Sequence, residues 1–267
     1  MYSSEVRDIF FTNTIEKLKS IKLIEGIIQL GSGVTGYKDD HSDIDLMVCT
    51  AGVEDVEETK NQVYRSFSDI TPYIIKEKRL RENVFLLIVF MENSLEFNVS
   101  IVQTDLLRVK SPLWKVVFDK TGMVTEKMNL ESERFNQKPV KYPVQDDVVF
   151  EFFYSSLKLD KELKRNNLIY ALKMLETMRD CTLQVQAMNE NKKLHQFKAY
   201  ETLNPSFIQR YLSTYPDQIT AEKVEAAAII LKELFIETVE KSEIHMVDHE
   251  LKQFLAMYPF SCKFAPK

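Results

Sequence analysis

Apolar residues near the start of the chain recur first at helical and then at strand spacing. Positions such as Ile9 and Ile15 follow approximately helical intervals, which predicts an amphipathic helix over residues 4–20. The run 22–30 is rich in Ile and Leu and predicts a strand, and the apolar run 43–49 predicts a second one. The first part of the chain is therefore predicted to combine helices with a β-sheet.

Two further apolar segments have the pattern of a β-hairpin. Residues 83–90 are almost continuously apolar, and residues 95–102 alternate between apolar and polar side chains after a short polar turn. Because successive strand residues point to opposite faces, Glu96 and Asn98 should face away from the apolar side chains of their own strand. The polar face of this hairpin is expected to lie beside the acidic residues at the head of the strand 43–49.

The second half of the chain has a different pattern. A short strand is predicted over 116–119, and residues 123–143, which include two prolines, lose a clear period. We therefore predict an α+β protein, with an α/β domain carrying a mixed sheet over 1–135 and an all-helical domain over 136–267. The predicted helices of the second domain are 145–164, 167–189, 199–212, 220–241 and 247–256.

A glycine-rich turn connects the first two predicted strands. Three of the six glycines of the chain fall within residues 31–36, in the order Gly-Ser-Gly-Val-Thr-Gly. Glycine allows the backbone to adopt positive φ and to approach a ligand closely, and the free N–H groups of such a turn can bind phosphate. The residues expected to contact a nucleotide are therefore Gly31, Ser32, Gly33 and, just before the second strand, Ser42.

Two carboxylates stand at the head of the second predicted strand. Asp43 and Asp45 are two positions apart, so their side chains point to the same face of a strand. Like charges repel when partly buried, and Mg²⁺, which prefers hard oxygen ligands, removes that repulsion. Glu96 is expected to add a third carboxylate, although its pattern also fits an ordinary outward-facing glutamate. A phosphate-binding turn beside metal-binding carboxylates is typical of phosphoryl or nucleotidyl transfer.

Composition and charge narrow the class of protein. The chain has 267 residues, 45% hydrophobic and 28% charged, as in a globular protein long enough for two domains. Its net charge of −5 disfavours a large nucleic-acid partner, although a local basic groove is compatible with it. The three cysteines form no C-x-x-C pattern, so no disulfide framework or zinc site is indicated. Without a visible signal peptide or a bilayer-spanning apolar run, the expected location is cytoplasmic, with no membrane partner.

Taken together, the motifs resemble a known superfamily. Gly-Ser, then Ser-Asp-Ile-Asp-Leu, then Glu96 on a later strand is similar to the nucleotidyltransferase superfamily with the DNA polymerase β-like fold. Three further segments resemble aminoglycoside (streptomycin) 6-adenylyltransferases and lincosamide nucleotidyltransferases. They are the strand and following residues 95–107, the strand and turn 116–122, and the helical segment 151–172. The resemblance covers roughly residues 25–185.

This resemblance implies a magnesium-dependent nucleotidyltransferase. Such an enzyme moves a nucleoside monophosphate from a triphosphate, here expected to be ATP, to a hydroxyl of a small acceptor such as an aminoglycoside-type or lincosamide-type antibiotic. Asp43 and Asp45 would bind Mg²⁺, and Glu96 would bind a second metal or accept the proton of the hydroxyl. Glu151, which begins an aromatic run, is the expected base in the acceptor-binding helical domain, with an ordinary surface glutamate as the alternative.

A second interpretation is a nucleotide-binding or interaction protein with the same fold and little transferase activity. Val34 and Thr35 stand where many relatives have an arginine, which favours this interpretation. The three acids favour the enzyme, because a buried carboxylate pair is unfavourable without a cation. A third possibility is an enzyme that modifies a protein or a tRNA end, and the net negative charge weighs against the tRNA version.

Overall fold

The computed structural model describes residues 3–36, 41–70, 72–137, 147–192, 199–247 and 249–251. The chain divides into two compact units, Met1–Pro139 and Val140–Lys267. The first unit is built around a β-sheet and the second is helical, which confirms the α+β organisation expected from the sequence. The sequence places the boundary after residue 135, which lies inside the last helix of the first unit, whereas the units divide after Pro139.

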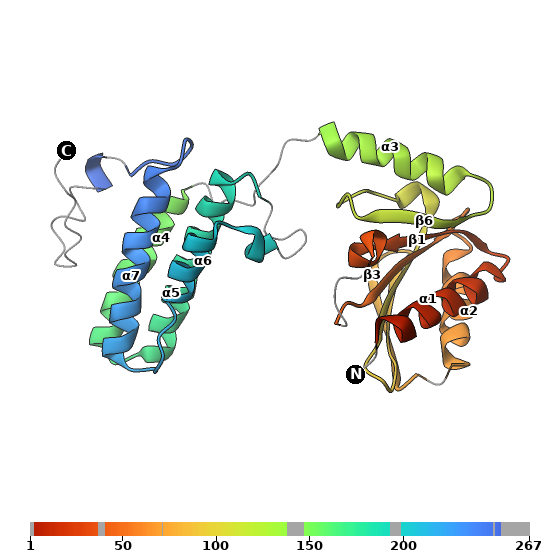
Figure 1. Cartoon of the computed structure of the whole chain (residues 1–267), viewed down its shortest axis with the longest axis horizontal. Coiled ribbons are helices and arrows are strands. Elements are labelled where there is room, and N and C mark those ends of the chain that lie inside the picture. The colour runs from red at the N-terminus through yellow and green to blue at the C-terminus, as the bar shows by residue number, and fades with distance from the viewer. Residues whose placement is uncertain are drawn as a thin grey trace. The chain divides into compact units, whose positions relative to one another are not determined.

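The described residues of the first unit form a six-stranded mixed sheet (Figure 1). Its strands are β1 (Ile24–Leu30), β2 (Ile44–Thr50), β3 (Ile74–Arg81), β4 (Val84–Phe90), β5 (Glu96–Gln103) and β6 (Trp114–Asp119). Its helices are α1 (Ser4–Lys19), α2 (Val56–Ser68) and α3 (Met123–Gln137), with the short 3₁₀ helices η1 (Gly31–Thr35) and η2 (Thr104–Leu106). The strand order is β3-β4-β5-β2-β1-β6. β2 and β5 pair in parallel, and the other neighbouring pairs are antiparallel.

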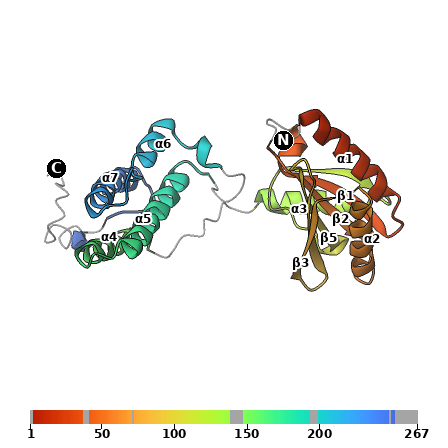
Figure 2. The same ribbon diagram turned by 90° about the horizontal axis from the view of Figure 1, so that it is seen from below.

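One face of the sheet is covered by α1 and α2 (Figure 2). Ile44, Leu46 and Val48 alternate along β2, and all three are fully buried against these helices. Phe97 of β5 is buried in the same cluster and meets the ring of Phe67 of α2 edge-on at 5.2 Å. This packing fixes the register of β2 against β5, since a slip of one residue would turn every one of these apolar side chains to the other face.

The opposite face is covered by α3 over part of its area (Figure 2). Val124 and Met128 of α3 are buried together with Ile28, Cys49 and Val102 of the sheet. These apolar contacts involve the later residues of β2 and β5. On the same face, the first residues of the two strands are polar and half-buried. The polar beginnings of β2 and β5 are therefore left open on this face by α3.

Three local features of the first unit differ from the sequence expectation. β3 is not predicted, because its exposed and mostly charged side chains give no apolar alternation. α3 forms where the period is weak, because only three of its residues are buried. In α1, Ile9 is 59% exposed instead of lying on the apolar face, and Arg7 is buried in its place. Each difference arises where tertiary packing, and not local hydrophobicity, decides burial.

The described part of the second unit is helical. Its elements are α4 (Val148–Lys164), α5 (Leu168–Asn189), η3 (Ala199–Thr202), α6 (Pro205–Leu212) and α7 (Ala221–Glu240). Phe152 and Phe235 stack at 3.7 Å in the core between α4 and α7. The expected helix 199–212 is split, because Asn204 caps α6 and Pro205 occupies its first turn. The expected helix 247–256 lies largely outside the described residues.

None of the helices that the structure describes is long and apolar enough to cross a membrane.

Candidate functional site

Gly31 brings the backbone of the glycine turn close to the carboxylate of Asp45. Its φ is +71°, a left-handed conformation that favours glycine. Its N–H donates to the carbonyl oxygen of Leu113 at 3.1 Å, which ties the turn to the segment before β6. A Cβ added to Gly31 would lie 2.8 Å from Oδ2 of Asp45, closer than real Cβ contacts allow. A side chain at residue 31 would therefore displace either the turn or the carboxylate of Asp45.

The rest of the turn forms the short 3₁₀ helix η1. Ser32 is exposed and Gly33 is half-buried. The first N–H groups of a helix have no partner inside it, so Ser32 and Gly33 carry the backbone donors that this turn can offer to a phosphate. The N–H of Gly31 is used within the fold, and the contribution of Gly31 is the space that it leaves for Asp45.

The two aspartates lie on the open face of the sheet. Asp45 is half-buried within β2, between Ile44 and Leu46, whose side chains are fully buried on the other face. Asp43 directly precedes β2 and is also half-buried. Because strand side chains alternate, Asp43 and Asp45 share one face. The folded chain thus gives this carboxylate pair the orientation expected from its spacing.

The parallel pairing of β2 with β5 brings a third carboxylate beside the pair. Ile44 lies opposite Phe97 and Asp45 lies opposite Asn98. One position earlier, the same register sets Asp43 against Glu96, the first residue of β5. Glu96 and Asn98 are both half-buried on the open face. The sheet therefore gathers Asp43, Asp45 and Glu96 at one end and adds the side-chain amide of Asn98.

The donor set fits a magnesium ion held jointly with a substrate. In nucleotide enzymes Mg²⁺ is usually held by one or two carboxylates together with phosphate oxygens. Asp43 and Asp45 supply such a pair, and the glycine at residue 31 leaves space beside Oδ2 of Asp45. No three His, Cys, Asp or Glu side chains within the described ranges are arranged to hold a metal ion on their own. Glu96 is thus a neighbour of the pair and not part of a preformed cage.

Comparison with known families relates this geometry to a class of enzymes. A family model named streptomycin adenylyltransferase matches residues 11–252. The chain belongs to the streptomycin adenylyltransferase family. The match includes the glycine turn, the three acids of the sheet and Glu151 in the second unit. It confirms the resemblance to nucleotidyltransferases that the sequence motifs indicate.

Solved structures with a similar chain trace include three nucleotidyltransferase-type proteins. An aminoglycoside 6-adenyltransferase from Bacillus subtilis is 15% identical, with a TM-score of 0.37 over 97% of this chain and 94% of that one. A nucleotidyltransferase-like protein from Exiguobacterium sibiricum 255-15 is 13% identical, with a TM-score of 0.33 over 93% and 85% of the two chains. A STING-associated CdnE c-di-GMP synthase from Capnocytophaga granulosa is 12% identical, with a TM-score of 0.35 over 90% and 82%. No curated protein matches the chain. These TM-scores are low, and the assignment rests on the family match.

In this member of the streptomycin adenylyltransferase family, Arg7 supports the site and is missed by sequence reasoning. The side chain is completely buried, and its Nη1 donates to the carbonyl oxygen of Ser42 at 3.2 Å. It thereby ties the backbone just before Asp43 to α1. A fully buried arginine is rare, so its burial marks a position where the fold requires a cation. The contact spans 35 positions of sequence, and no local pattern announces it.

The turn after β6 uses its polar residues for the fold of this family member. Oδ2 of Asp119 accepts hydrogen bonds from the N–H and the hydroxyl of Thr125, which lies in the first turn of α3. Burial opposes ionisation of Asp119, but the hydrogen bonds from Thr125 and Gly122 outweigh it and hold the pKa of Asp119 below its usual value. Lys120 donates to the carbonyl oxygen of Lys22. These contacts favour turn formation, and not phosphate binding, as the role of this segment.

Glu151, the base expected from the family resemblance, lies on α4 of the second unit. It is half-buried, and Oε1 accepts a hydrogen bond from the hydroxyl of Ser155 at 3.5 Å. Tyr154 and Lys158 follow at helical spacing, and the ammonium of Lys158 lies 4.1 Å from the ring centre of Tyr154.

Burial raises the pKa of the Cys181 thiol to about 12, with smaller contributions from the charges of Glu151 and Asp180, so this thiol is inert at neutral pH.

Proposed function

We propose that the protein transfers a nucleoside monophosphate from ATP to a hydroxyl of a small acceptor, with an aminoglycoside-type antibiotic as the first candidate and a lincosamide-type antibiotic as the second. The observation that carries the proposal is the β2–β5 register, which sets Asp43 and Asp45 beside Glu96 next to a glycine turn. Membership of the streptomycin adenylyltransferase family supports it.

In this proposal the turn and the aspartate pair bind the triphosphate. The N–H groups of Ser32 and Gly33 donate to phosphate oxygens, and Ser42 stands at the same end of β2. Asp43 and Asp45 hold Mg²⁺, which when bound offsets the negative charge of the phosphates. The protein then contributes mainly position and electrostatic complementarity, because the transfer needs no covalent intermediate with a side chain.

The acceptor hydroxyl must lose a proton during the transfer. Its oxygen forms a bond to the α-phosphorus, while the bond from that phosphorus to the bridging oxygen of pyrophosphate breaks. Glu96 either accepts this proton or helps to hold a second metal ion, and Glu151 is the second carboxylate proposed as the base. The variants Glu96→Gln and Glu151→Gln distinguish the roles of these two carboxylates.

Pyrophosphate release tests the proposal most simply. The protein is incubated with Mg²⁺ and each of the four common ribonucleoside triphosphates, with and without a panel of aminoglycosides and lincosamides. We expect release that requires Mg²⁺, ATP and one acceptor class. A protein that binds triphosphate but releases no pyrophosphate would match the nucleotide-binding alternative, and one that does neither would match the interaction role.

Glu96→Gln is expected to lower kcat about 100-fold, because the amide neither accepts a proton at neutral pH nor binds a cation as a carboxylate does. Steady-state pyrophosphate release over a range of Mg²⁺ concentrations measures the effect. If excess Mg²⁺ restores turnover, Glu96 is a metal ligand; if it does not, Glu96 is the base. Glu92→Gln, an exposed glutamate in the preceding turn, is the control and should keep wild-type turnover. Unchanged turnover in Glu96→Gln would remove Glu96 from the site.

Glu151→Gln is expected to lower kcat about 100-fold with little change in the KM for ATP, because a base acts on the acceptor and not on the nucleotide. Initial rates at varied ATP and saturating acceptor give both constants. Glu225→Gln, at an exposed position of α7 in the same unit, is the matched control. If both variants keep wild-type rates, Glu151 is an ordinary surface glutamate.

A further inference from the structure

The edge strand β3 presents cations on the open face of the sheet. Glu77 accepts a hydrogen bond from Lys60 of α2 at 3.1 Å, so Glu77 points to the face that α2 covers. Because strand side chains alternate, Lys76 and Lys78 point to the opposite face, which is the face of the candidate site. Arg79 confirms the alternation, since its guanidinium lies 5.8 Å from the ring centre of Phe85 on the α2 side.

Arg81 joins the two lysines after a register shift. The pairing of β3 with β4 shifts between Arg79 and Arg81, which turns Arg81 to the same face as Lys78. Its partner Val84 packs against the cluster that contains Met128 of α3. Lys76, Lys78 and Arg81 are all exposed. Within the part of the chain that the structure describes, none of the three has an ion-pair partner.

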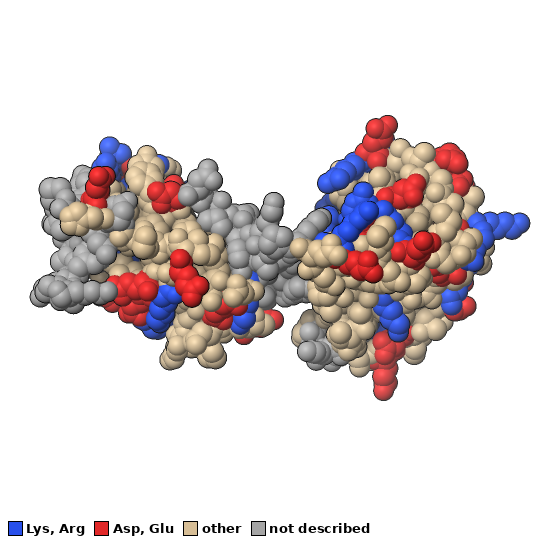
Figure 3. All heavy atoms as spheres, turned by 90° about the horizontal axis from the view of Figure 1, so that it is seen from above, with Lys and Arg blue, Asp and Glu red and all other residues tan. Residues whose placement is uncertain are grey.

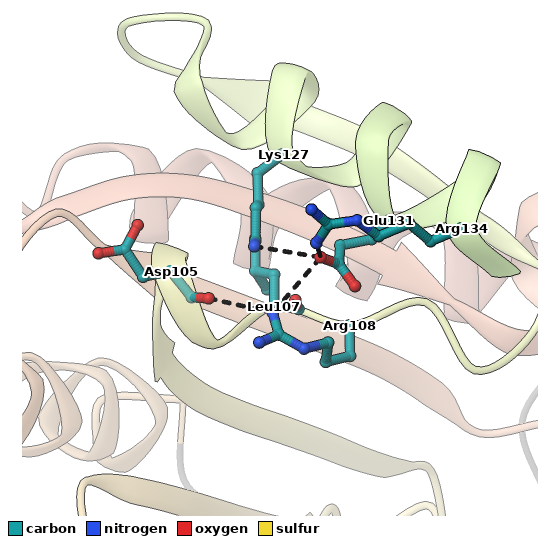
Figure 4. Close-up of polar contacts among 6 residues, drawn as sticks. All are labelled: Asp105, Leu107, Arg108, Lys127, Glu131 and Arg134. Atoms are coloured by element: carbon teal, nitrogen blue, oxygen red, sulfur yellow. Dashed lines mark hydrogen bonds and ion pairs between the residues drawn. The ribbon is translucent and has the colours of Figure 1, made fainter.

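A second group of cations lies where α3 meets the segment after β5 (Figure 4). Glu131 is only 5% exposed, and its Oε1 lies 2.7 Å from Arg134, 3.2 Å from Lys127 and 3.5 Å from Arg108. Arg108 and Arg134 remain 53% and 54% exposed. In Figure 4 the side chain of Asp105 points away from this group, and Arg108 donates to its backbone carbonyl oxygen. One carboxylate is therefore shared by three cations.

The two groups form one surface, which we call the basic face. Its members are Lys76, Lys78, Arg81, Arg108, Lys127 and Arg134. The cluster of Val84, Val102, Leu107 and Met128 connects β4, which pairs with β3, to α3 beneath them. Figure 3 shows Lys and Arg side chains gathered on the first unit on the side of α3. The chain as a whole has a net charge of −5, so this local excess of positive charge is not a consequence of composition.

The shape of the basic face fits an extended ligand. Alternate residues of a strand are about 6.6 Å apart, and the cations continue from β3 to α3, so they form a row and not a single point of positive charge. Apolar side chains accompany them: Ile88 lies opposite Lys76, Leu86 lies opposite Lys78, and the ring of Phe90 is 37% exposed. Cations that follow the nucleic-acid backbone, together with apolar and aromatic side chains that contact the bases, are the features of single-strand binding.

We propose that the basic face binds single-stranded nucleic acid, which is a property separate from nucleotidyl transfer. Lys76, Lys78 and Arg81 contact phosphates along β3, and Arg108 and Arg134 continue the track on the side of α3. Leu86, Ile88 and Phe90 contact bases. The net negative charge of the chain does not oppose this binding, because screening at physiological salt confines electrostatic interactions to about 8 Å around each charge.

Fluorescence anisotropy of the full-length chain with a labelled single-stranded oligonucleotide tests the proposal. Each phosphate contact lowers the slope of log affinity against log salt by about 0.7 for single strands. Lys76→Gln with Lys78→Gln should therefore make the slope less negative by about 1.4 and weaken binding about 20-fold at 0.1 M salt. Arg65→Gln with Lys115→Gln removes the same charge from exposed positions away from this face and should bind as the wild type does.

Three outcomes would overturn the proposal. The first is no salt-dependent binding at protein concentrations up to about 100 µM. The second is an equal loss of affinity in the control variant. The third is displacement of the oligonucleotide by an acidic polypeptide at equal charge concentration, which would indicate a protein partner. Arg134→Gln is a second variant on α3 in case the strand variant does not fold, and its slope should change by about 0.7. Asp43→Asn with Asp45→Asn should retain binding, so that failure of the transfer reaction and failure of this proposal are distinguishable.

Discussion

Asp43→Asn combined with Asp45→Asn is expected to lower nucleotidyl transfer by at least about 10³-fold, because a bound metal ion contributes several kcal/mol to the stabilisation of developing charge. The amide side chains keep the size of the aspartates but lose the negative charge that holds Mg²⁺. Pyrophosphate release with ATP and acceptor measures the loss, and calorimetric titration of ATP with Mg²⁺ should show that metal-dependent binding is lost as well.

The same double variant should keep the fold. Asp43, directly before β2, and Asp45 within β2 are half-buried, and asparagine has nearly the same size as aspartate. We expect a melting temperature close to that of the wild type. Asp105→Asn, at an exposed position of η2 directly after β5, is the control and should change neither activity nor stability. An active double variant would contradict the assignment of this pair as the metal-binding residues.

Gly31→Ala is expected to lower activity about 100-fold, because displacement of a catalytic group by about 1 Å can have that effect. Alanine at residue 31 would keep a φ of +71° only with strain and would place Cβ 2.8 Å from Oδ2 of Asp45. Left-handed backbone costs a non-glycine residue about 1–2 kcal/mol. Kinetic constants and urea unfolding of the variant separate the effect on the carboxylate from the effect on stability.

Gly36→Ala is the matched control for Gly31→Ala. Gly36 also has a positive φ, at +84°, but an added Cβ there meets nothing within 4 Å. Gly36→Ala should therefore lose about 1–3 kcal/mol of stability through backbone strain and retain the catalytic rate. If both variants lose activity equally, strain of the turn, and not displacement of Asp45, explains the effect.

The parts of the site that sequence reasoning could predict are those with a local period. The two-residue spacing of Asp43 and Asp45 and the alternation around Glu96 each predict a face, and the sheet has those faces. The register that aligns Asp45 with Asn98 follows from the buried alternation of both strands, although the sequence alone did not specify parallel pairing. Local periodicity therefore predicts which face of a strand each side chain points to. It does not by itself specify which strands pair or in which direction.

The parts that sequence reasoning missed depend on long-range contacts. Arg7 is buried because it reaches the backbone before Asp43, and its helix position resembles that of any exposed arginine. β3 has charged residues on both faces because it is an edge strand, so it lacks apolar alternation. The basic face was hidden for a different reason, since averaging charge over the chain cancels a local excess.

Label transfer from ATP is the measurement that tests the central claim most directly. The protein is incubated with Mg²⁺, an aminoglycoside panel and ATP labelled at either the α- or the γ-phosphate, and the acceptor is separated from nucleotide. The account predicts that label from the α position enters the acceptor, that label from the γ position leaves as pyrophosphate, and that Asp43→Asn with Asp45→Asn abolishes the transfer. Entry of γ-label into the acceptor, or α-label transfer that persists in the double variant, would contradict it.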